Sequence, residues 1–236
     1  MRLLLGIIFC LILPTTASAS LTSQLYTGDA FTVSPGKVQL RSYYNSSFGG
    51  PQRVVGGSFT FGATKSVDAK LSYGYLWNNA GQDVRIGPNI GVKWRFIGDG
   101  VRKPSAAVST LYAINEGIGG ESHKNDFGSL LIVQYPVAPM VYLANFGHVW
   151  VGDEDAFDLR YVSFAAGRFF SGRRLGALEY SQLSRLGRPY GRHTNQVTAA
   201  FAYSSNESLT YTGQLGYLWS GLNSNYNLTL GISLYL

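Results

Sequence analysis

The chain has 236 residues, of which 45% are hydrophobic, 14% are aromatic and only 14% are charged. Soluble domains carry about 25% charged residues, so this composition argues against an ordinary soluble protein. The net charge of +6 is not gathered into a basic cluster, and it therefore does not indicate a nucleic-acid partner.

Residues 1–19 have the three parts of a secretory signal peptide. A positive start at 1–2 is followed by an apolar run at 3–14 and by an A-x-A cleavage site at 17–19. The apolar run is shorter than the roughly 20 residues that a membrane-spanning helix needs. We therefore expect residues 1–19 to be removed when the protein is exported.

The one cysteine, Cys10, lies within the expected signal peptide. The exported chain therefore has neither a disulfide framework nor a thiolate metal site. The sequence contains no closely spaced set of histidine and acidic residues of the kind that binds a metal. We therefore expect no metal and no cofactor. Residues 20–36 follow without regular alternation, so we expect a terminal segment there and no strand.

Beyond residue 36 the chain divides into twelve extended segments of roughly 9 to 14 residues, separated by turn-forming residues. We expect strands at 37–46, 52–63, 66–77, 83–96, 103–115, 126–136, 139–151, 157–170, 174–185, 195–205, 208–219 and 226–236. From Val84 to Phe96 every even-numbered residue is apolar, and every odd-numbered one is polar or glycine. Alternation is less clear between 103 and 185, which predicts a bulge or a shifted register there.

Alternation also suits a soluble β-sandwich, so other features must decide. The segments exceed the usual five or six residues of soluble strands and match the 9–11 tilted residues that cross a bilayer. Their number is even, as in bacterial outer-membrane barrels. Trp77, Trp94 and Trp219 end apolar stripes, and we expect them to be interfacial anchors. The predicted fold is an all-β, transmembrane, antiparallel up-and-down barrel of 12 strands over 37–236, in the outer membrane of a Gram-negative bacterium.

The predicted connections fit this topology. With a periplasmic N-terminus, the odd-to-even connections face outward and should be longer, and the two longest, 116–125 and 186–194, are among them. The last segment should pair with the first, because a spanning sheet must close on itself. A terminal alternating strand also resembles the signal read by the barrel-assembly machinery, although this one ends Tyr235-Leu236 where such signals usually end in an aromatic residue.

The alternation turns most charged residues of the strands toward the lumen. The candidates for lining the lumen or binding a solute are Lys37, Arg41, Asp68, Lys70, Arg85, Lys93, Arg95 and Glu179. A polar, net-basic interior predicts a channel for small solutes, anionic ones among them. Alternatively, these groups pair with one another and fill a narrow barrel. Residues 20–36 either plug the barrel, line its periplasmic mouth or stay mobile.

An enzyme and a structural barrel are the competing interpretations. His123, His148 and His193 are the histidines available to a phospholipid or lipid A hydrolase, but no G-x-S-x-G or H-E-x-x-H motif accompanies them. We therefore assign no catalytic residue. Arg185, Arg188 and Arg192 around Tyr190 suit either a solvated outer loop or a site for lipopolysaccharide phosphates. A non-conducting structural or adhesive barrel is the third possibility.

Several stretches resemble a known family. They are Pro35-Gly36-Lys37, "FGATKSVDAKLSYGY" (61–75), "GPNIGVKWRF" (87–96) and "KPSAAVSTLYAI" (103–114), the last without the Pro-Thr-Gly often found at its end. Over residues 28–115 the chain is similar to the family named for the MetA pathway of phenol degradation, which consists of bacterial outer-membrane barrels. The resemblance implies a transport protein and supplies no functional residues. A phenolic or other aromatic cargo is implied by the family name alone.

Overall fold

The computed structural model describes residues 29–48, 53–77, 84–114, 125–152, 158–171, 173–186, 193–221 and 223–236. These residues form twelve β-strands: β1 (Val38–Phe48), β2 (Arg53–Gly62), β3 (Val67–Trp77), β4 (Val84–Ile97), β5 (Ser105–Ala113), β6 (Asp126–Val137), β7 (Met140–Trp150), β8 (Leu159–Ser171), β9 (Arg174–Arg185), β10 (His193–Ser204), β11 (Leu209–Ser220) and β12 (Asn223–Tyr235). Each expected segment corresponds to one strand, with ends that differ by a few residues.

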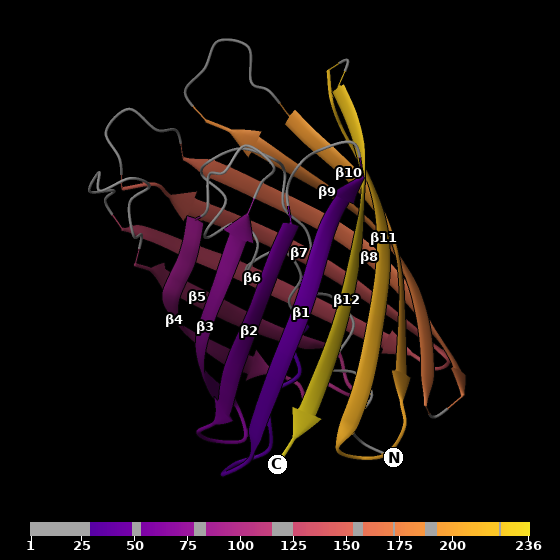
Figure 1. Cartoon of the computed structure of the whole chain (residues 1–236). Coiled ribbons are helices and arrows are strands. Elements are labelled where there is room, and N and C mark those ends of the chain that lie inside the picture. Colours follow the sequence, from indigo (N-terminus) through magenta and orange to yellow (C-terminus); the bar gives the residue numbers. More distant parts are fainter. Residues whose placement is uncertain are drawn as a thin grey trace.

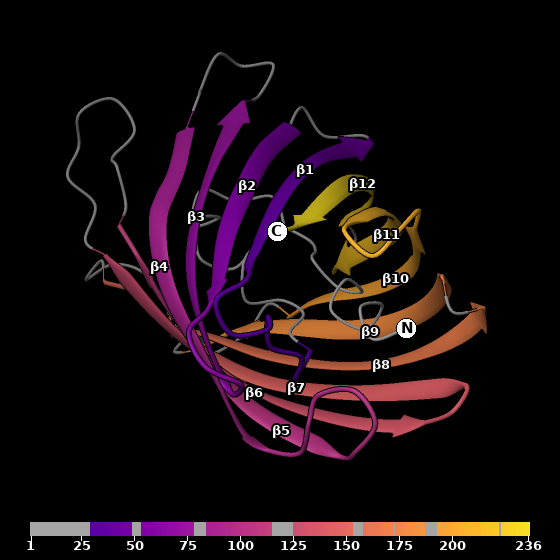
Figure 2. The same ribbon diagram turned by 90° about the horizontal axis from the view of Figure 1, so that it is seen from below.

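The strands form one closed antiparallel barrel in which each strand pairs with its neighbours in sequence (Figures 1 and 2). The barrel is closed by β1 and β12, where Leu40 pairs with Leu234. The Val38 N–H donates to Leu236 O at 3.1 Å, and the Leu236 N–H donates to Val38 O at 2.8 Å. The predicted pairing of the first and last strands is confirmed, and it leaves the sheet without an open edge.

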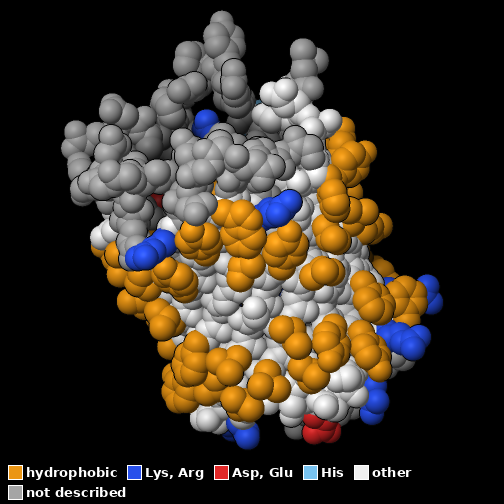
Figure 3. Space-filling model, in the orientation of Figure 1, with side chains coloured by type: hydrophobic (Ala, Val, Ile, Leu, Met, Phe, Trp, Pro, Cys, Tyr) orange, Lys and Arg blue, Asp and Glu red, His pale blue; other side chains and the backbone are white. Residues whose placement is uncertain are grey.

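The outer face of the barrel is apolar. On β3, for example, Leu71, Tyr73 and Tyr75 are exposed, whereas Ser72 and Gly74 between them are buried. Figure 3 shows hydrophobic side chains gathered in an upper and a lower band on one side of the barrel. Exposed aromatic side chains near the two ends of the strands, such as Tyr226 on β12 and Trp94 on β4, match the girdles that barrels place at the two membrane–water interfaces. Among the described residues, no helix has the length and apolar character to span a membrane.

The two ends of the barrel differ in their connections. Short turns such as Ala138–Pro139 lie at the end where β12 finishes. Connections at the opposite end are longer, and the two longest predicted ones, 116–125 and 186–194, fall largely outside the described residues. Because bacterial barrels have short periplasmic turns, we call the end bearing Leu236 the periplasmic end and the opposite one the outer end.

The inner face has two parts of different chemistry. Strands β5–β9 carry most of the buried apolar side chains; we call their inner face the apolar arc, and its main cluster contains Ala107, Leu111, Ala113, Leu130, Ile132, Val149, Leu159 and Tyr161. Strands β10–β12 and β1–β4 form the polar arc, with buried Asn45, Thr60, Asp68, Ser72, Asn89, Thr198, Thr210, Thr212, Gln214, Asn227, Thr229 and Ser233. Alternation is unclear between 103 and 185 chiefly because most residues on both faces of the apolar arc are hydrophobic. Gln134, Asn145, Ser163 and Glu179 are buried polar exceptions on its inner face. Register shifts also occur at Arg95/Ile97 and Phe169/Ser171.

Candidate functional site: the barrel interior

Residues 29–34 precede a turn at Pro35–Gly36 and lie inside the barrel; we call them the inner segment. Ala30, Thr32 and Val33 are buried. Ala30 packs into the main cluster of the apolar arc. In Figure 2 this part of the chain lies inside the ring of strands. The inner segment therefore occupies part of the periplasmic half of the lumen.

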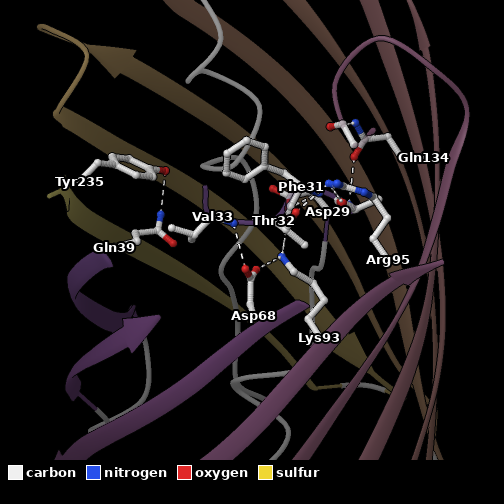
Figure 4. A network of polar contacts seen from close by, with 12 residues as sticks. Asp29, Phe31, Thr32, Val33, Gln39, Asp68, Lys93, Arg95, Gln134 and Tyr235 are labelled. Atoms are coloured by element: carbon white, nitrogen blue, oxygen red, sulfur yellow. Dashed lines mark hydrogen bonds and ion pairs between the residues drawn. The ribbon is translucent and has the colours of Figure 1, made fainter. Parts of the chain in front are cut away.

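Buried side chains of the wall hold the backbone of the inner segment (Figure 4). The Val33 N–H donates to Asp68 Oδ1 on β3 at 2.9 Å. On β6, Gln134 Oε1 accepts from the Ala30 N–H at 3.1 Å, and Gln134 Nε2 donates to Gly100 O at 2.8 Å. Because Gln134 is fully buried, both ends of its amide are satisfied within the protein.

Two cations of β4 bind the carbonyl side of the same segment. Lys93 Nζ donates to Phe31 O. Arg95 Nη1 donates to Thr32 Oγ1 at 2.7 Å, and Arg95 Nη2 donates to Lys65 O in the β2–β3 turn. Lys93 Nζ also lies 3.3 Å from Asp68 Oδ2. Lys93 and the Val33 N–H offset part of the cost of burying the Asp68 carboxylate, which is only 1% exposed.

Two glycines leave space for the inner segment. A Cβ on Gly62 would lie 2.5 Å from Val33 O and would also overlap Ser34 O. A Cβ on Gly100, whose φ is +73°, would lie 2.6 Å from Ala30 O. Gly62 and Gly36 are further joined by a bond of 2.8 Å from Gly36 N–H to Gly62 O. The inner segment thus fits against the wall because glycines leave space for it, as well as because polar side chains bind it.

The predicted lumen residues have different environments. Asp68, Lys93 and Arg95 converge on the inner segment, as described. Arg41 and Lys70 belong to the inward faces of β1 and β3, where their register partners are Ser58 and Thr60. Glu179 is buried on β9 and accepts a hydrogen bond from Tyr161 Oη at 3.1 Å. Lys37 is exposed and directly precedes β1.

The prediction that Arg85 faces the lumen is wrong. Between Ser72 and Gly74 the β3–β4 register shifts, because β4 contains one extra residue at a bulge around Gly87. Beyond this bulge Arg85 pairs with Tyr75, which is 38% exposed on the outer face. Paired residues share a face, so Arg85 lies on the outside of the barrel and is exposed there.

The interior is consequently less basic than the sequence predicted. The charged side chains described on the inward face or in the inner segment are Arg41, Lys70, Lys93, Arg95 and Arg185, and Asp29, Asp68, Asp126 and Glu179. Cations and carboxylates are thus close to balanced in the described part of the chain. The sequence did not reveal Gln134, Gly62 or Gly100 as residues that hold the inner segment or leave space for it, because each is typical of an ordinary strand or turn position.

The histidines do not form a hydrolase triad in the described part of the chain. His148 Nε2 lies 3.3 Å from Asp158 Oδ2, and Ser184 Oγ lies 2.8 Å from His193 Nδ1. His148 and His193 are on β7 and β10, three interstrand steps apart, which is on the order of 14 Å. The serine and the carboxylate therefore contact different imidazoles, whereas a triad needs both on one. His123 lies outside the described residues.

The predicted interfacial tryptophans lie at both ends of the outer face. Trp77 and Trp219 are near the outer ends of β3 and β11, and Trp94 is near the periplasmic end of β4, where it is 55% exposed. Trp77 neighbours Tyr75 with ring centroids 6.0 Å apart, and Trp219 neighbours Tyr217 at 5.6 Å. Their role as membrane anchors stays a prediction, supported by this placement.

Solved structures share the fold at low sequence identity. The NanC porin is 12% identical, with a TM-score of 0.63 over 84% of this chain and 98% of the porin. An outer-membrane channel from Pseudomonas putida F1 is 9% identical, with a TM-score of 0.66 over 90% of this chain and 100% of that chain. The KdgM porin, solved in complex with disordered oligogalacturonate, is 9% identical, with a TM-score of 0.54 over 83% and 98%. No family model and no curated protein matches the sequence.

At these identities the likeness concerns the fold alone. The closed barrel of twelve antiparallel strands, its apolar outer face and its likeness to these structures identify the chain as a porin-like outer-membrane β-barrel. The resemblance to the MetA-pathway family over residues 28–115 is not supported by a family model and stays a prediction.

Proposed function

We propose that the protein is an outer-membrane channel for small amphipathic solutes, which carry a polar or anionic group on an apolar, for instance aromatic, body. The division of the interior into a polar and an apolar arc carries this proposal. A solute with a polar and an apolar face matches an interior with a polar and an apolar arc, once the packed side chains of the two arcs make room for it. The KdgM porin, which shares the fold, was solved with an oligogalacturonate; we extend only the general idea of solute passage to this chain.

In this proposal the inner segment controls the periplasmic mouth. Arg95 Nη1 donates to the Ala30 carbonyl and the Thr32 hydroxyl of the segment, which are both uncharged. Lys93 Nζ, in contrast, already lies 3.7 Å from Asp29 Oδ1 of the segment and 3.3 Å from Asp68 Oδ2. Because a carboxylate is a stronger partner for a guanidinium than a carbonyl oxygen, an anionic solute competes with the inner segment for Arg95, and its arrival loosens the segment.

Planar-bilayer conductance of the full mature protein tests the channel. We expect a small current from the wild type and a several-fold larger one from Gly62→Ala, since the added Cβ overlaps the carbonyl oxygens of Val33 and Ser34. Gly213→Ala is the matched control, because its Cβ would meet only Leu230, at 3.8 Å, and we expect no change. If none of the three proteins conducts, the channel proposal fails and the structural barrel is favoured.

Liposome swelling tests the class of solute. Benzoate should enter faster than an uncharged sugar of similar size, and Arg95→Gln should reduce that preference. An equal reduction for both solutes would argue against a role of Arg95 in selection.

The contact between Ser184 and His193 favours a hydrolase as the second candidate function. Phospholipid hydrolysis by the wild type that is lost in Ser184→Ala would support it. We expect no such activity, because no described carboxylate orients His193.

A further inference from the structure

Two arginines lie on the outer face of the barrel, close to its outer end. Arg53 begins β2, and Arg85 is the second residue of β4. Arg53 pairs with Trp77 of β3, and Arg85 pairs with Tyr75 of the same strand. The two arginines are therefore two interstrand steps apart, on the order of 10 Å, and both are exposed.

Aromatic rings separate the two arginines and place them at the level of a girdle. The ring centroids of Trp77 and Tyr75 are 6.0 Å apart, and Tyr44 lies 6.5 Å from Trp77. Such rings belong at the headgroup level of a membrane. Figure 3 shows Lys or Arg side chains on this side of the molecule at the height of the upper hydrophobic band.

The chemistry of this surface is cationic and amphipathic. The described outward-facing residues on the outer third of β1–β4 are Tyr44, Ser46, Phe48, Arg53, Val55, Tyr75, Trp77 and Arg85, and none of them is acidic. Below them, toward the membrane centre, Phe59, Leu71 and Ile90 are exposed apolar side chains. A ligand that carries phosphates above and hydrocarbon below matches both parts.

The bulge in β4 is what creates this pair of arginines. Without the extra residue, Arg85 would keep the parity of Asn89 and Lys93 and would point inward. The bulge depends on Gly87, whose φ is +98° and whose Cβ would lie 2.9 Å from Asn89 N and 3.0 Å from Ser72 O. A backbone that only glycine adopts readily thus carries Arg85 to the outer face, beside Arg53.

We propose that Arg53 and Arg85 bind phosphate groups of lipopolysaccharide in the outer leaflet, with Trp77 and Tyr75 between them. Guanidinium groups bind phosphate oxygens in a bidentate manner, and this geometry discriminates phosphate from other headgroup atoms. The acyl chains of the same lipid lie along the apolar side chains beneath. The site is separate from the lumen and does not rest on the proposed channel function.

Binding of bisphosphorylated lipid A to the full mature protein in detergent tests the proposal. Native mass spectrometry should show retained lipid on the wild type, and Arg53→Gln/Arg85→Gln should weaken binding about tenfold or more, since charge-assisted bonds to two groups are lost. The matched control is Arg168→Gln, because Arg168 is also exposed on the outer face but lies toward the periplasmic end, near Phe170. We expect wild-type binding from this control.

Further arms identify the source of the phosphate and control for folding. Dephosphorylated lipid A should bind the wild type about as weakly as lipid A binds the double variant. Equal binding of the two lipids, or an unchanged double variant, would overturn the proposal. If inorganic phosphate alone bound the protein as strongly as lipid A does, the assignment of the ligand to a lipid would be overturned. Heat-modified gel mobility shows that each variant is folded, and Gly87→Ala gives a second route, because it should weaken lipid binding by misplacing Arg85 while both arginines remain.

Discussion

The polar and the apolar arc of the inner face satisfy the same barrel in different ways. In the polar arc, buried side chains bond across strands, as when Asn45 Nδ2 donates to Thr229 Oγ1 at 2.5 Å. Ser204 and Thr210 are joined by their hydroxyls at 2.7 Å. In the apolar arc, the buried residues around Ile132 pack directly. The inner face of one barrel is thus stabilised by side-chain hydrogen bonds in one part and by apolar packing in the other.

The inner segment contacts both the polar and the apolar arc. Its polar contacts with Asp68, Lys93 and Arg95 lie on the polar arc, whereas Ala30 packs on the apolar arc. One short piece of chain therefore bridges the two kinds of wall. Substitutions on either side should reveal how much each contributes.

The largest expected loss in the free energy of unfolding comes from a substitution in the apolar arc. Ile132 is fully buried there, so Ile132→Ala should lower the free energy of unfolding by about 2–5 kcal/mol through lost contacts and a cavity. Ile232→Ala is the control, because Ile232 is 41% exposed on the outer face. Urea unfolding in lipid vesicles measures both, and equal losses would contradict the packed apolar arc.

A smaller effect is expected at a polar group within the apolar arc. Tyr161→Phe removes the donor to buried Glu179 and should lower the free energy of unfolding by about 1–3 kcal/mol. Tyr211→Phe is the control, because Tyr211 is 45% exposed on the outer face. If the control loses as much stability as Tyr161→Phe, the buried bond is not what Tyr161 contributes.

The smallest loss of stability is expected from a substitution in the β4–β5 connection, where the two arcs join. Asp99 Oδ1 accepts from the backbone N–H groups of Val101, Arg102 and Lys103 at 2.9, 2.8 and 3.0 Å. Partial burial opposes ionisation, but these bonds prevail and lower the pKa of Asp99 from 3.8 to about 2. Because this pKa is lowered on folding, Asp99 stabilises the fold fully above about pH 5, and the contribution fades as the pH falls toward 2.

The matching variant is Asp99→Asn. Its stability deficit relative to the wild type should be constant between about pH 5 and pH 7 and should shrink toward about pH 2. Denaturant midpoints of both proteins across this range provide the measurement. A deficit that grows on acidification would show that the carboxylate is not the stabilising form.

The strands were predictable because residues of the polar arc alternate strictly with outer apolar ones. From Val67 to Trp77 the alternation is regular, and the structure places β3 there with the expected faces. In the apolar arc most residues on both faces are hydrophobic, so the alternation of odd and even positions no longer distinguishes the inner from the outer face. The turns still mark where the strands lie. Near Arg85 the parity itself was misleading, because one extra backbone residue at a bulge leaves no mark in a hydrophobic pattern.

The contents of the interior were less predictable than its wall. Sequence parity identified Asp68, Lys93 and Arg95 as inward-facing, and the structure brings them together. Their partners are backbone atoms of the inner segment, such as the Val33 N–H and Phe31 O. Any residue type offers those atoms, so no sequence signal marks them.

The reciprocal bonds between Val38 and Leu236 have a kinetic consequence. The seam of the barrel joins the two strands that are farthest apart in sequence, so its ladder forms only after the entire chain has been translated and delivered. Until then, β1 and the most recently added strand are edge strands with unpaired backbone groups, which can associate with other chains. Chaperones that shield extended segments in transit are accordingly most needed for the interval before β12 arrives.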